Sequence, residues 1–161
     1  MIRHCTGADV ACIDAIINEA ARDYRGVIPS DCWHEPYMPR HELLDEIAGG
    51  VNFWGWEDAS ALMGVMGIQK VRDETLIRHA YVRPSHPSRG IGGALLAALV
   101  SQASGHLLVG TWAAAELAIR FYQRHGFRLV SMEEKDRLLG TYWNISRRQQ
   151  ESSVVLAFAG N

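Results

Sequence analysis

Long apolar runs and an excess of charge of one sign are both missing from this sequence. The longest strictly apolar stretch, residues 94–100, has seven residues, whereas a membrane-spanning helix needs roughly 18 or more. The 16 basic and 18 acidic side chains give a formal net charge of −2, which offers no electrostatic footprint for a nucleic acid. We therefore expect neither a membrane protein nor a nucleic-acid-binding protein.

Cysteine is also scarce, with Cys5, Cys12 and Cys32 as the three cysteines of the chain. Their odd number and their spacings of 7 and 20 residues fit neither a disulfide framework nor a Cys-x-x-Cys metal site. The first residues contain no apolar stretch of signal-peptide length. These absences predict a cytoplasmic protein with reduced cysteines and no bound metal.

The apolar residues that are present suffice for one hydrophobic core. Of the 161 residues, 48% are hydrophobic and 21% are charged, and a chain of this length buries roughly 70% of its unfolded surface. No internal repeat, low-complexity tract or linker divides the chain. We expect a single folded domain over residues 1–161.

The first half of the chain has the pattern of two helices and a meander of strands. Apolar residues recur every three or four positions over residues 9–24, which predicts a helix. Glycine and proline break regular structure over residues 25–40, and a short second helix is expected at 41–48. Short polar connections separate three extended runs and predict antiparallel neighbours at residues 51–56, 61–71 and 75–83.

The second half alternates helices and strands. Helical patterns cover residues 92–101 and 114–125, a further helical turn is expected at 133–139, and extended runs occupy 107–112, 127–131 and 152–159. With a short strand at the start of the chain, these elements predict an α/β (α+β) fold. Its central sheet is expected to be mixed and mostly antiparallel, with about seven strands flanked by about four helices.

A glycine-rich loop follows the strand that ends near Pro84. Gly90, Gly92 and Gly93 carry no side chains, so backbone amides can approach a ligand closely. The free N–H groups and the dipole of a helix N-terminus favour an anion there, and Arg89 adds a full positive charge. The loop is therefore predicted to bind a phosphate; the alternative is a tight turn before a packed helix.

Two common phosphate loops are excluded by what this loop lacks. A Walker loop needs Gly-Lys-Ser/Thr, which is absent. A dinucleotide-binding fingerprint needs a third glycine where Leu95 stands, and an acidic residue about 20 positions further on. Residues 110–114 contain no carboxylate. A different phosphate-containing ligand is therefore expected.

Two motifs of the second half resemble those of one known family. Residues 82–84 are Val-Arg-Pro, and residues 89–96 are Arg-Gly-Ile-Gly-Gly-Ala-Leu-Leu, similar to a Gln/Arg-x-x-Gly-x-Gly/Ala pyrophosphate signature. Residues 118–127 are Ala-Ile-Arg-Phe-Tyr-Gln-Arg-His-Gly-Phe, similar to an Ala-x-x-Phe-Tyr-x-x-x-Gly-Phe segment. Both belong to the GCN5-related N-acetyltransferases (GNAT family), which move an acetyl group from acetyl-CoA to an amine. The resemblance implies one GNAT domain with the acyl-CoA N-acyltransferase fold.

Acetyl-CoA is the co-substrate that this resemblance implies. Two positions depart from the family pattern: Pro87, which has no N–H, replaces the usual Gln or Arg, and Ala115 stands where Asn is frequent. These departures keep a non-catalytic CoA-binding regulatory module as an alternative to an enzyme. The residues expected to hold the CoA are Val82, Arg83, Arg89, Gly90, Ile91, Gly92, Gly93, Ala94, Ala115 and Tyr122.

Tyr122 is the tyrosine that, by resemblance, protonates the departing CoA thiolate. Ala115, Ala118 and Tyr122 follow helical spacing, so two small residues lead up to the phenol. A phenol with an unperturbed pKa near 10 suits a proton donor. Leu117 and Phe121 lie about 100° around the helix and are expected to serve the core. A tyrosine that only packs in the core is the alternative for Tyr122.

A proton acceptor is needed because a primary amine is mostly ammonium at neutral pH. His79 is the first candidate, since it lies on the strand before the loop and imidazole titrates near 6.5. Alternation along a strand would turn Arg78 and His79 to opposite faces, and the pattern leaves open which face is the active one. A water chain to Glu74 or Glu35 is the alternative.

The acceptor is expected to be a small-molecule amine, because no charge pattern indicates a peptide groove. A protein or peptide N-acetyltransferase, and a homodimer, are kept as alternatives. A carboxylate such as Glu35 can hold an ammonium, and aromatic faces add cation–π attraction; alternatively, these residues cover the core. By resemblance, the lining of the acceptor pocket comprises Tyr24, Trp33, His34, Glu35, Tyr37 and Trp112.

Overall fold

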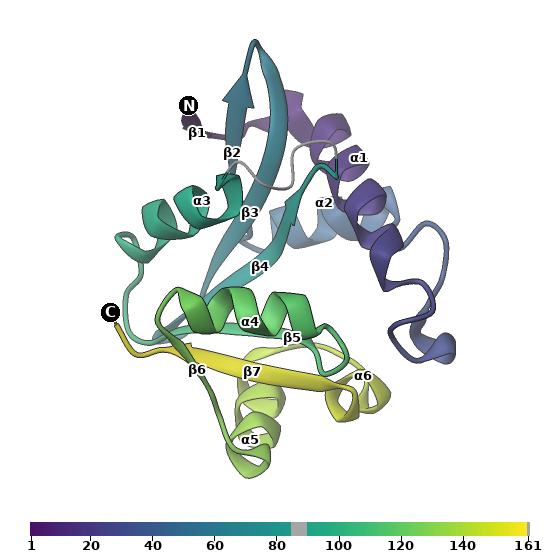
Figure 1. The fold of residues 1–161 in the computed structure, drawn as a ribbon, viewed down its shortest axis with the longest axis vertical. Coiled ribbons are helices and arrows are strands. Elements are labelled where there is room, and N and C mark those ends of the chain that lie inside the picture. The colour runs from purple at the N-terminus through teal and green to yellow at the C-terminus, as the bar shows by residue number, and fades with distance from the viewer. Residues whose placement is uncertain (85–89, 161) are drawn as a thin grey trace.

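One mixed sheet organises the protein, whose structure is a computed structural model that describes residues 1–84 and 90–160 (Figure 1). The strands are β1 (Ile2–His4), β2 (Asn52–Asp58), β3 (Ala61–Val71), β4 (Glu74–Val82), β5 (Leu107–Trp112), β6 (Phe127–Leu129) and β7 (Ser153–Phe158). Their order in the sheet is β1-β2-β3-β4-β5-β7-β6. Among the strands of the described residues, only β4 and β5 pair in parallel. The expected seven-stranded, mostly antiparallel sheet is confirmed.

The described residues contain six α-helices, two more than the four expected. They are α1 (Val10–Ala20), α2 (Arg40–Ala48), α3 (Ile91–Val100), α4 (Glu116–Arg124), α5 (Met132–Tyr142) and α6 (Arg147–Glu151). The helical turn expected at 133–139 is the full helix α5, whereas α6 was not expected because five residues are too few to display a helical period. Within residues 1–84 and 90–160, no helix is long and apolar enough to cross a membrane.

Two short turns build the meander of β2, β3 and β4. Ala59 and Ser60 have φ values of +49° and +67°, the left-handed backbone that two-residue hairpin turns require. Arg72 has a φ of +55° between β3 and β4. Both strand pairs are antiparallel, as the short polar connections predicted.

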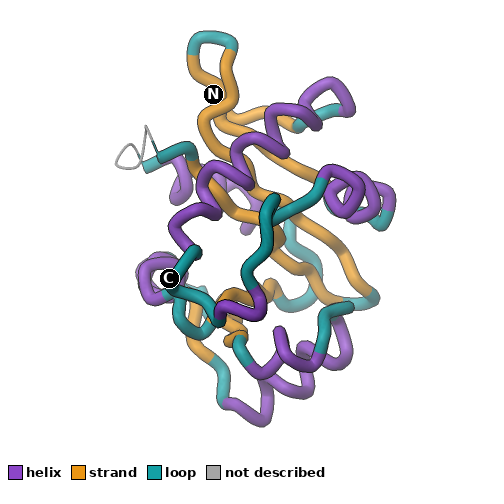
Figure 2. The backbone as a smooth tube through the Cα atoms, turned by 90° about the vertical axis from the view of Figure 1, so that its right-hand side faces the viewer, coloured by secondary structure: helices purple, strands orange, loops and turns teal. Residues whose placement is uncertain are grey.

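Helices cover both faces of the sheet, as Figure 2 shows. On β3, Val65 packs into a cluster with residues of α1 and α2, whereas the next residue, Met66, packs into a cluster with residues of α3. On β5, Leu108 packs against α5. Because successive side chains of a strand point to opposite faces, these neighbours bury both surfaces of the sheet.

Strands β4 and β5 part from each other in the middle of the sheet. They pair over Thr75–Ile77 and Leu107–Val109, beyond which no β4–β5 pair is formed in the described chain. β4 continues beside β3 up to Val82, and β5 continues beside β7 up to Trp112. The parted strands leave the space in which the candidate site lies.

Candidate active site

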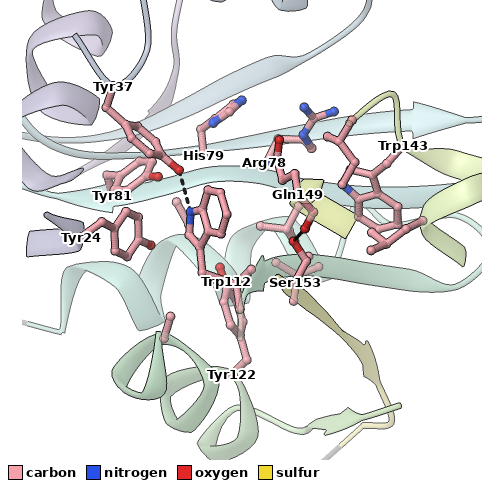
Figure 3. A pocket seen from close by; sticks show the side chains of 18 residues that line it. Tyr24, Tyr37, Arg78, His79, Tyr81, Trp112, Tyr122, Trp143, Gln149 and Ser153 are labelled. Carbon is pink, nitrogen blue, oxygen red and sulfur yellow. Dashed lines mark hydrogen bonds between the residues drawn. The ribbon is translucent and has the colours of Figure 1, made fainter. Parts of the chain in front are cut away.

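A cavity of about 140 Å³ lies where β4 and β5 part, and we call it the inner cavity (Figure 3). The end of β4 and the end of β5 form two of its walls. Helix α4 contributes Ala118 and Tyr122, the segment after α5 contributes Trp143, and α6 contributes Gln149. Figure 3 shows Tyr24, Tyr37 and Tyr81 on one side of the cavity and Trp143, Gln149 and Ser153 on the other. Residues from both ends of the chain therefore converge on one space.

Neutral aromatic groups dominate one side of the inner cavity. Trp112 Nε1 donates a hydrogen bond to Tyr37 Oη at 2.8 Å, and the Tyr24 ring lies 5.7 Å from the Tyr37 ring and 6.3 Å from the Tyr81 ring, centroid to centroid. Burial raises the pKa of Tyr37 to about 12 and also raises the pKa of Tyr24 and Tyr81. These phenols are uncharged at neutral pH. They can therefore attract an ammonium group through their ring faces, but not as counter-ions.

A second, apolar cavity of about 150 Å³ lies between β4 and α4. Val82 and Gly92 are among its lining residues, with Phe121 on the side of α4. Four residues line both the apolar and the inner cavity: Ala80, Tyr81, Ala118 and Tyr122. The two cavities therefore meet beside Tyr122.

The first turn of α3 begins on three glycines. Gly90, at the start of this helix, has a φ of +69°, which favours glycine. A Cβ on Gly92 would lie 3.4 Å from the Phe121 ring, and one on Gly93 would lie 2.8 Å from His125 Nε2. The missing side chains of Gly92 and Gly93 therefore let α3 pack closely against Phe121 and His125. The first-turn amides have no intrahelical partner, so they can donate to an anion such as a phosphate of CoA.

The other residues expected to hold CoA are distributed unevenly. The guanidinium of Arg83 forms a salt bridge with Glu19 of α1, with Nη1 and Oε2 2.9 Å apart. Ile91 is buried in the core, so only its backbone can face a ligand, while Ala94 is partly buried in the first turn of α3. Ala115 is buried in a cluster with Trp112. Arg89 and Pro87 lie outside the described residues.

Tyr122 is a buried residue at the junction of the two cavities, with 5% of its surface exposed. Its ring packs 5.1 Å from the Phe121 ring and 5.3 Å from the Phe127 ring. Burial raises the pKa of Tyr122, so the phenol does not have the unperturbed pKa expected from sequence. A raised pKa keeps its proton in place until a stronger base arrives.

The face of α4 that carries Leu117 does not serve the core. Leu117 is 80% exposed, so the core position expected for it is wrong, whereas Phe121 packs against the cluster that contains α3. The side of α4 that carries Ala118 and Tyr122 faces the sheet. Leu117 lies about 100° around the helix from Ala118. That rotation turns Leu117 to solvent.

A β-bulge in β4 changes where His79 points. Val65 is opposite Tyr81 and Gly67 is opposite Arg78, so one residue of β3 faces two of β4, as in a β-bulge. His79 has a φ of +54°, a left-handed conformation that costs a non-glycine residue about 1–3 kcal/mol. The expected alternation of Arg78 and His79 is therefore wrong, and both line the inner cavity, extending to the same side of β4 in Figure 3.

A third, outer cavity of about 710 Å³ adjoins the inner cavity. Tyr37, Arg78, His79, Trp112 and Gln149 line both. Its acidic lining residues are Asp31, Glu42, Asp45 and Glu46, and its arginines are Arg78 and Arg148. The outer cavity therefore carries more carboxylates than guanidinium groups.

An ion pair joins two walls of the outer cavity that lie far apart in sequence. Arg148 Nε and Nη2 donate to the two carboxylate oxygens of Asp31 at 2.7 and 3.2 Å. This bidentate pair links the start of α6 to the segment before α2. Sequence reasoning missed Arg148, because no local pattern connects positions 117 residues apart.

The residues expected to bind the acceptor are brought together only in part. Tyr24, Tyr37 and Trp112 line the inner cavity, and His34 lines the outer one. Trp33 packs behind Tyr37, with ring centroids 5.8 Å apart. Of the residues proposed here from sequence, four therefore line one of the two cavities, and Trp33 lies behind one of them.

The two alternative proton acceptors lie away from these cavities. Glu35 is exposed and lies 3.8 Å from Arg25. Glu74, at the start of β4, is buried and its carboxylate lies 2.9 Å from His106 Nδ1. Neither lines the inner, apolar or outer cavity. In the described part of the chain, no group of three or more His, Cys, Asp and Glu residues is arranged to hold a metal ion.

The parted strands and the glycine-opened helix beside them define an acyl-CoA N-acyltransferase fold. Residues 49–129 match the family model described as an acetyltransferase (GNAT) domain. The chain therefore belongs to the GNAT family of N-acetyltransferases, which confirms the family resemblance and the enzyme class expected from its motifs.

Known relatives agree with this assignment. The peptidyl-lysine N-acetyltransferase YiaC of Escherichia coli is 27% identical over 126 residues, covering 74% of this chain and 84% of that protein. The PaiA N-acetyltransferase of Thermoplasma acidophilum, solved in complex with coenzyme A, superposes with a TM-score of 0.73 at 17% identity, covering 99% and 98% of the two chains. A ribosomal-protein-alanine N-acetyltransferase of Brucella melitensis gives a TM-score of 0.68 at 18% identity, covering 99% of both. At these identities the two structures show a shared fold.

Proposed function

We propose that this enzyme transfers the acetyl group of acetyl-CoA to the primary amine of a small molecule, in one domain over residues 1–161. The observation that carries the proposal is the junction of the apolar and inner cavities at Tyr122. One cavity suits a thin apolar chain and the other an amine. At their meeting point, the Tyr122 hydroxyl would serve as a proton donor to the two substrates.

Acetyl-CoA would enter from the side of α3. Val82, Gly92 and Phe121 line the apolar cavity and would pack against the pantetheine chain, while the first-turn amides of α3 would bind the pyrophosphate. Bound there, acetyl-CoA supplies an activated thioester. The coenzyme A in the structurally similar PaiA N-acetyltransferase supports this use of the fold.

The acceptor amine would enter through the outer cavity. The excess of carboxylates there attracts a cation, and the ring faces of Tyr24, Tyr37 and Trp112 then hold the ammonium in the inner cavity. At about 140 Å³, the inner cavity has room for a slender amine end only. A primary amine on an unbranched chain fits this shape.

The Arg148–Asp31 ion pair favours a small acceptor over a folded protein. It spans the outer cavity between α6 and the segment before α2, and so narrows the access that a protein surface would need. Lysine in a flexible peptide is the second candidate acceptor, since its side chain is also a slender primary amine and the relative YiaC is a peptidyl-lysine N-acetyltransferase.

Tyr122 and His79 would divide the proton transfers. His79 accepts one proton from the acceptor ammonium and passes it to solvent, which leaves a neutral amine able to attack the thioester carbonyl. As the nitrogen–carbon bond forms and the carbon–sulfur bond breaks, Tyr122 gives its hydroxyl proton to the sulfur. The second proton that the nitrogen loses restores the Tyr122 hydroxyl. Positioning and proton transfer thus suffice, without a covalent enzyme intermediate.

A panel of acceptors tests the proposal. Primary amines with unbranched chains, branched amines and lysine-containing peptides are each incubated with acetyl-CoA, while thiol release and the product mass are recorded. Acetylated unbranched amines are expected to form fastest. Acetylation of peptides alone would replace the small-molecule acceptor by the second candidate.

A further inference from the structure

Glu46, a residue of α2, holds the two side chains that the β4 bulge turns to one side. Its Oε1 atom lies 2.6 Å from His79 Nε2 and 2.8 Å from Arg78 Nη2. The three side chains are largely buried, with between 16% and 24% of their surface exposed. One carboxylate oxygen thus joins the bulge to α2, across 33 positions of sequence.

The contact with Glu46 selects one form of the His79 ring. A carboxylate accepts hydrogen bonds, so the proton of a neutral imidazole stands on Nε2 and the lone pair is left on Nδ1. Burial acts to raise the pKa of Glu46, but the hydrogen bond and charge of His79, with a smaller contribution from the charge of Arg78, outweigh it, and the net shift of the pKa is downward. An ionised Glu46 is what this arrangement requires.

The ring of His79 is held from other directions too. Phe53 of β2 lies nearly parallel to it, with ring centroids 6.2 Å apart and an interplanar angle of 22°. Arg78 Nη1 donates to Gln69 Oε1 at 2.8 Å, which fixes the second partner of Glu46. The left-handed backbone of His79 persists because these contacts determine where its side chain goes.

We propose that Glu46 is a positioning residue for the proton acceptor: it fixes the Nε2–H tautomer of His79 and leaves Nδ1 as the basic nitrogen on the acceptor route. This inference rests on the proposed function, because it assigns Glu46 a part in the acceptance of the acceptor's proton. Glu46 itself does not touch the reacting atoms. It acts through His79, in the way that a carboxylate orients a catalytic imidazole elsewhere.

The pH dependence of the reaction carries the signature of this role. Glu46 places a carboxylate beside the His79 ring, and Arg78 pairs with the same carboxylate. The other titratable groups that face the same cavities are Glu42 and Asp45 of α2, Asp31, Cys32, His34 and Tyr37 of the segment before α2, Arg148 of α6, and Tyr24, Tyr81 and Tyr122. Replacing Glu46 by glutamine removes this negative charge from the side of His79, so the acidic limb of the pH–rate profile of Glu46→Gln is expected to differ from that of the unmodified enzyme.

Nitrogen NMR of the enzyme with labelled histidine reads the tautomer directly. The His79 signals are identified by their loss in His79→Gln. The proposal expects an Nε2–H tautomer for neutral His79 in the unmodified enzyme, and loss of this preference in Glu46→Gln. An Nδ1–H tautomer, or a ring protonated throughout the active pH range, overturns it. This measurement needs no acceptor, so it stands apart from a failure of the proposed function, which would show as an absence of acetylated amine.

Steady-state kinetics with acetyl-CoA and an amine complete the test. Glu46→Gln is expected to lower kcat roughly 10- to 100-fold, since a general base contributes about 10² to 10⁴, with an unchanged KM for acetyl-CoA. Glu57→Gln is the matched control: Glu57 also pairs with an arginine, Arg3 at 3.1 Å, and is 23% exposed against 24% for Glu46. Equal kcat and equal acidic limbs in the two variants overturn the proposal. If Glu46→Gln does not fold, two other measurements decide the question. One is the tautomer of His79 in the unmodified enzyme. The other is the activity of Glu46→Asp, which keeps the charge and is expected to retain more activity than His79→Gln.

Discussion

Tyr122 of α4 and Tyr81 of β4 line the same two cavities, one apolar and one aromatic. Both phenols are buried enough to have raised pKa values, so they are neutral hydrogen-bonding groups at the point where the cavities meet. A donor substrate that fills one cavity and an acceptor that fills the other would come into contact there. The predictions below test the two cavities and the residues between them.

Tyr122→Phe should separate catalysis from binding. The variant loses the hydroxyl proton that the departing sulfur needs but keeps the ring that packs against Phe121 and Phe127. We expect kcat to fall roughly 100-fold or more, while the Kd of acetyl-CoA from calorimetry stays the same. An unchanged kcat would remove Tyr122 from the proton transfer.

Gly92→Val should weaken acetyl-CoA binding. A branched side chain at Gly92 would enter the apolar cavity and press on Phe121, since even a Cβ would come within 3.4 Å of that ring. A side chain that occupies the apolar cavity excludes part of the pantetheine chain, so the Kd should rise roughly tenfold, which corresponds to about 1.4 kcal/mol. Gly140→Val is the control, because Gly140 of α5 has open space around its Cβ position. Equal Kd values for the two variants would contradict the assigned place of acetyl-CoA.

Arg148→Met should relax the choice of acceptor. Without the bidentate bonds from Arg148 to Asp31, the two walls of the outer cavity are no longer joined. We expect kcat/KM for bulky amines to rise about two- to fivefold, because a half-exposed ion pair contributes little energy. Arg147→Met removes the neighbouring arginine, which pairs with Glu151 of its own helix, and should leave the acceptor profile unchanged. A double-mutant cycle with Asp31→Asn that gives no coupling would count against the ion pair.

Asp9→Asn should destabilise the protein in a pH-dependent manner. Hydrogen bonds from Arg3 and from the Thr6 backbone lower the pKa of Asp9 from 3.8 to about 2. Because the folded-state pKa is depressed, the carboxylate stabilises the fold above about pH 4, and this stabilisation is lost as the pH falls toward 2. We expect a loss of about 1 kcal/mol at pH 7, measured by urea unfolding. A loss that stays constant from pH 7 to pH 2 would contradict the assigned cause.

Local patterns in the sequence predict most of this fold. The polar connections before β3 and β4 are short, so antiparallel pairing of β2, β3 and β4 follows from chain geometry alone. The glycines at 90, 92 and 93 likewise indicate a helix that opens on free amides. Such features depend on neighbours in sequence, which is why they can be recognised without the structure.

The unpredicted parts of the site depend on contacts between distant residues. A histidine with a left-handed backbone conformation has no sequence signature. The alternation rule therefore places Arg78 and His79 on opposite faces of β4, and it does not predict that both contact Glu46. The Arg148–Asp31 pair and the exposure of Leu117 also depend on how helices pack on the sheet. Sequence spacing therefore identifies the chemical groups but not the bulge that brings them together.

The position of the CoA sulfur in a crystal of the enzyme with coenzyme A tests the central claim most directly. The account predicts that the pantetheine chain lies in the apolar cavity beside Val82 and Gly92, and that the sulfur lies within hydrogen-bonding reach of Tyr122 Oη, at the mouth of the inner cavity. A sulfur that lies outside the junction, with Tyr122 separated from it by other side chains, would contradict the account.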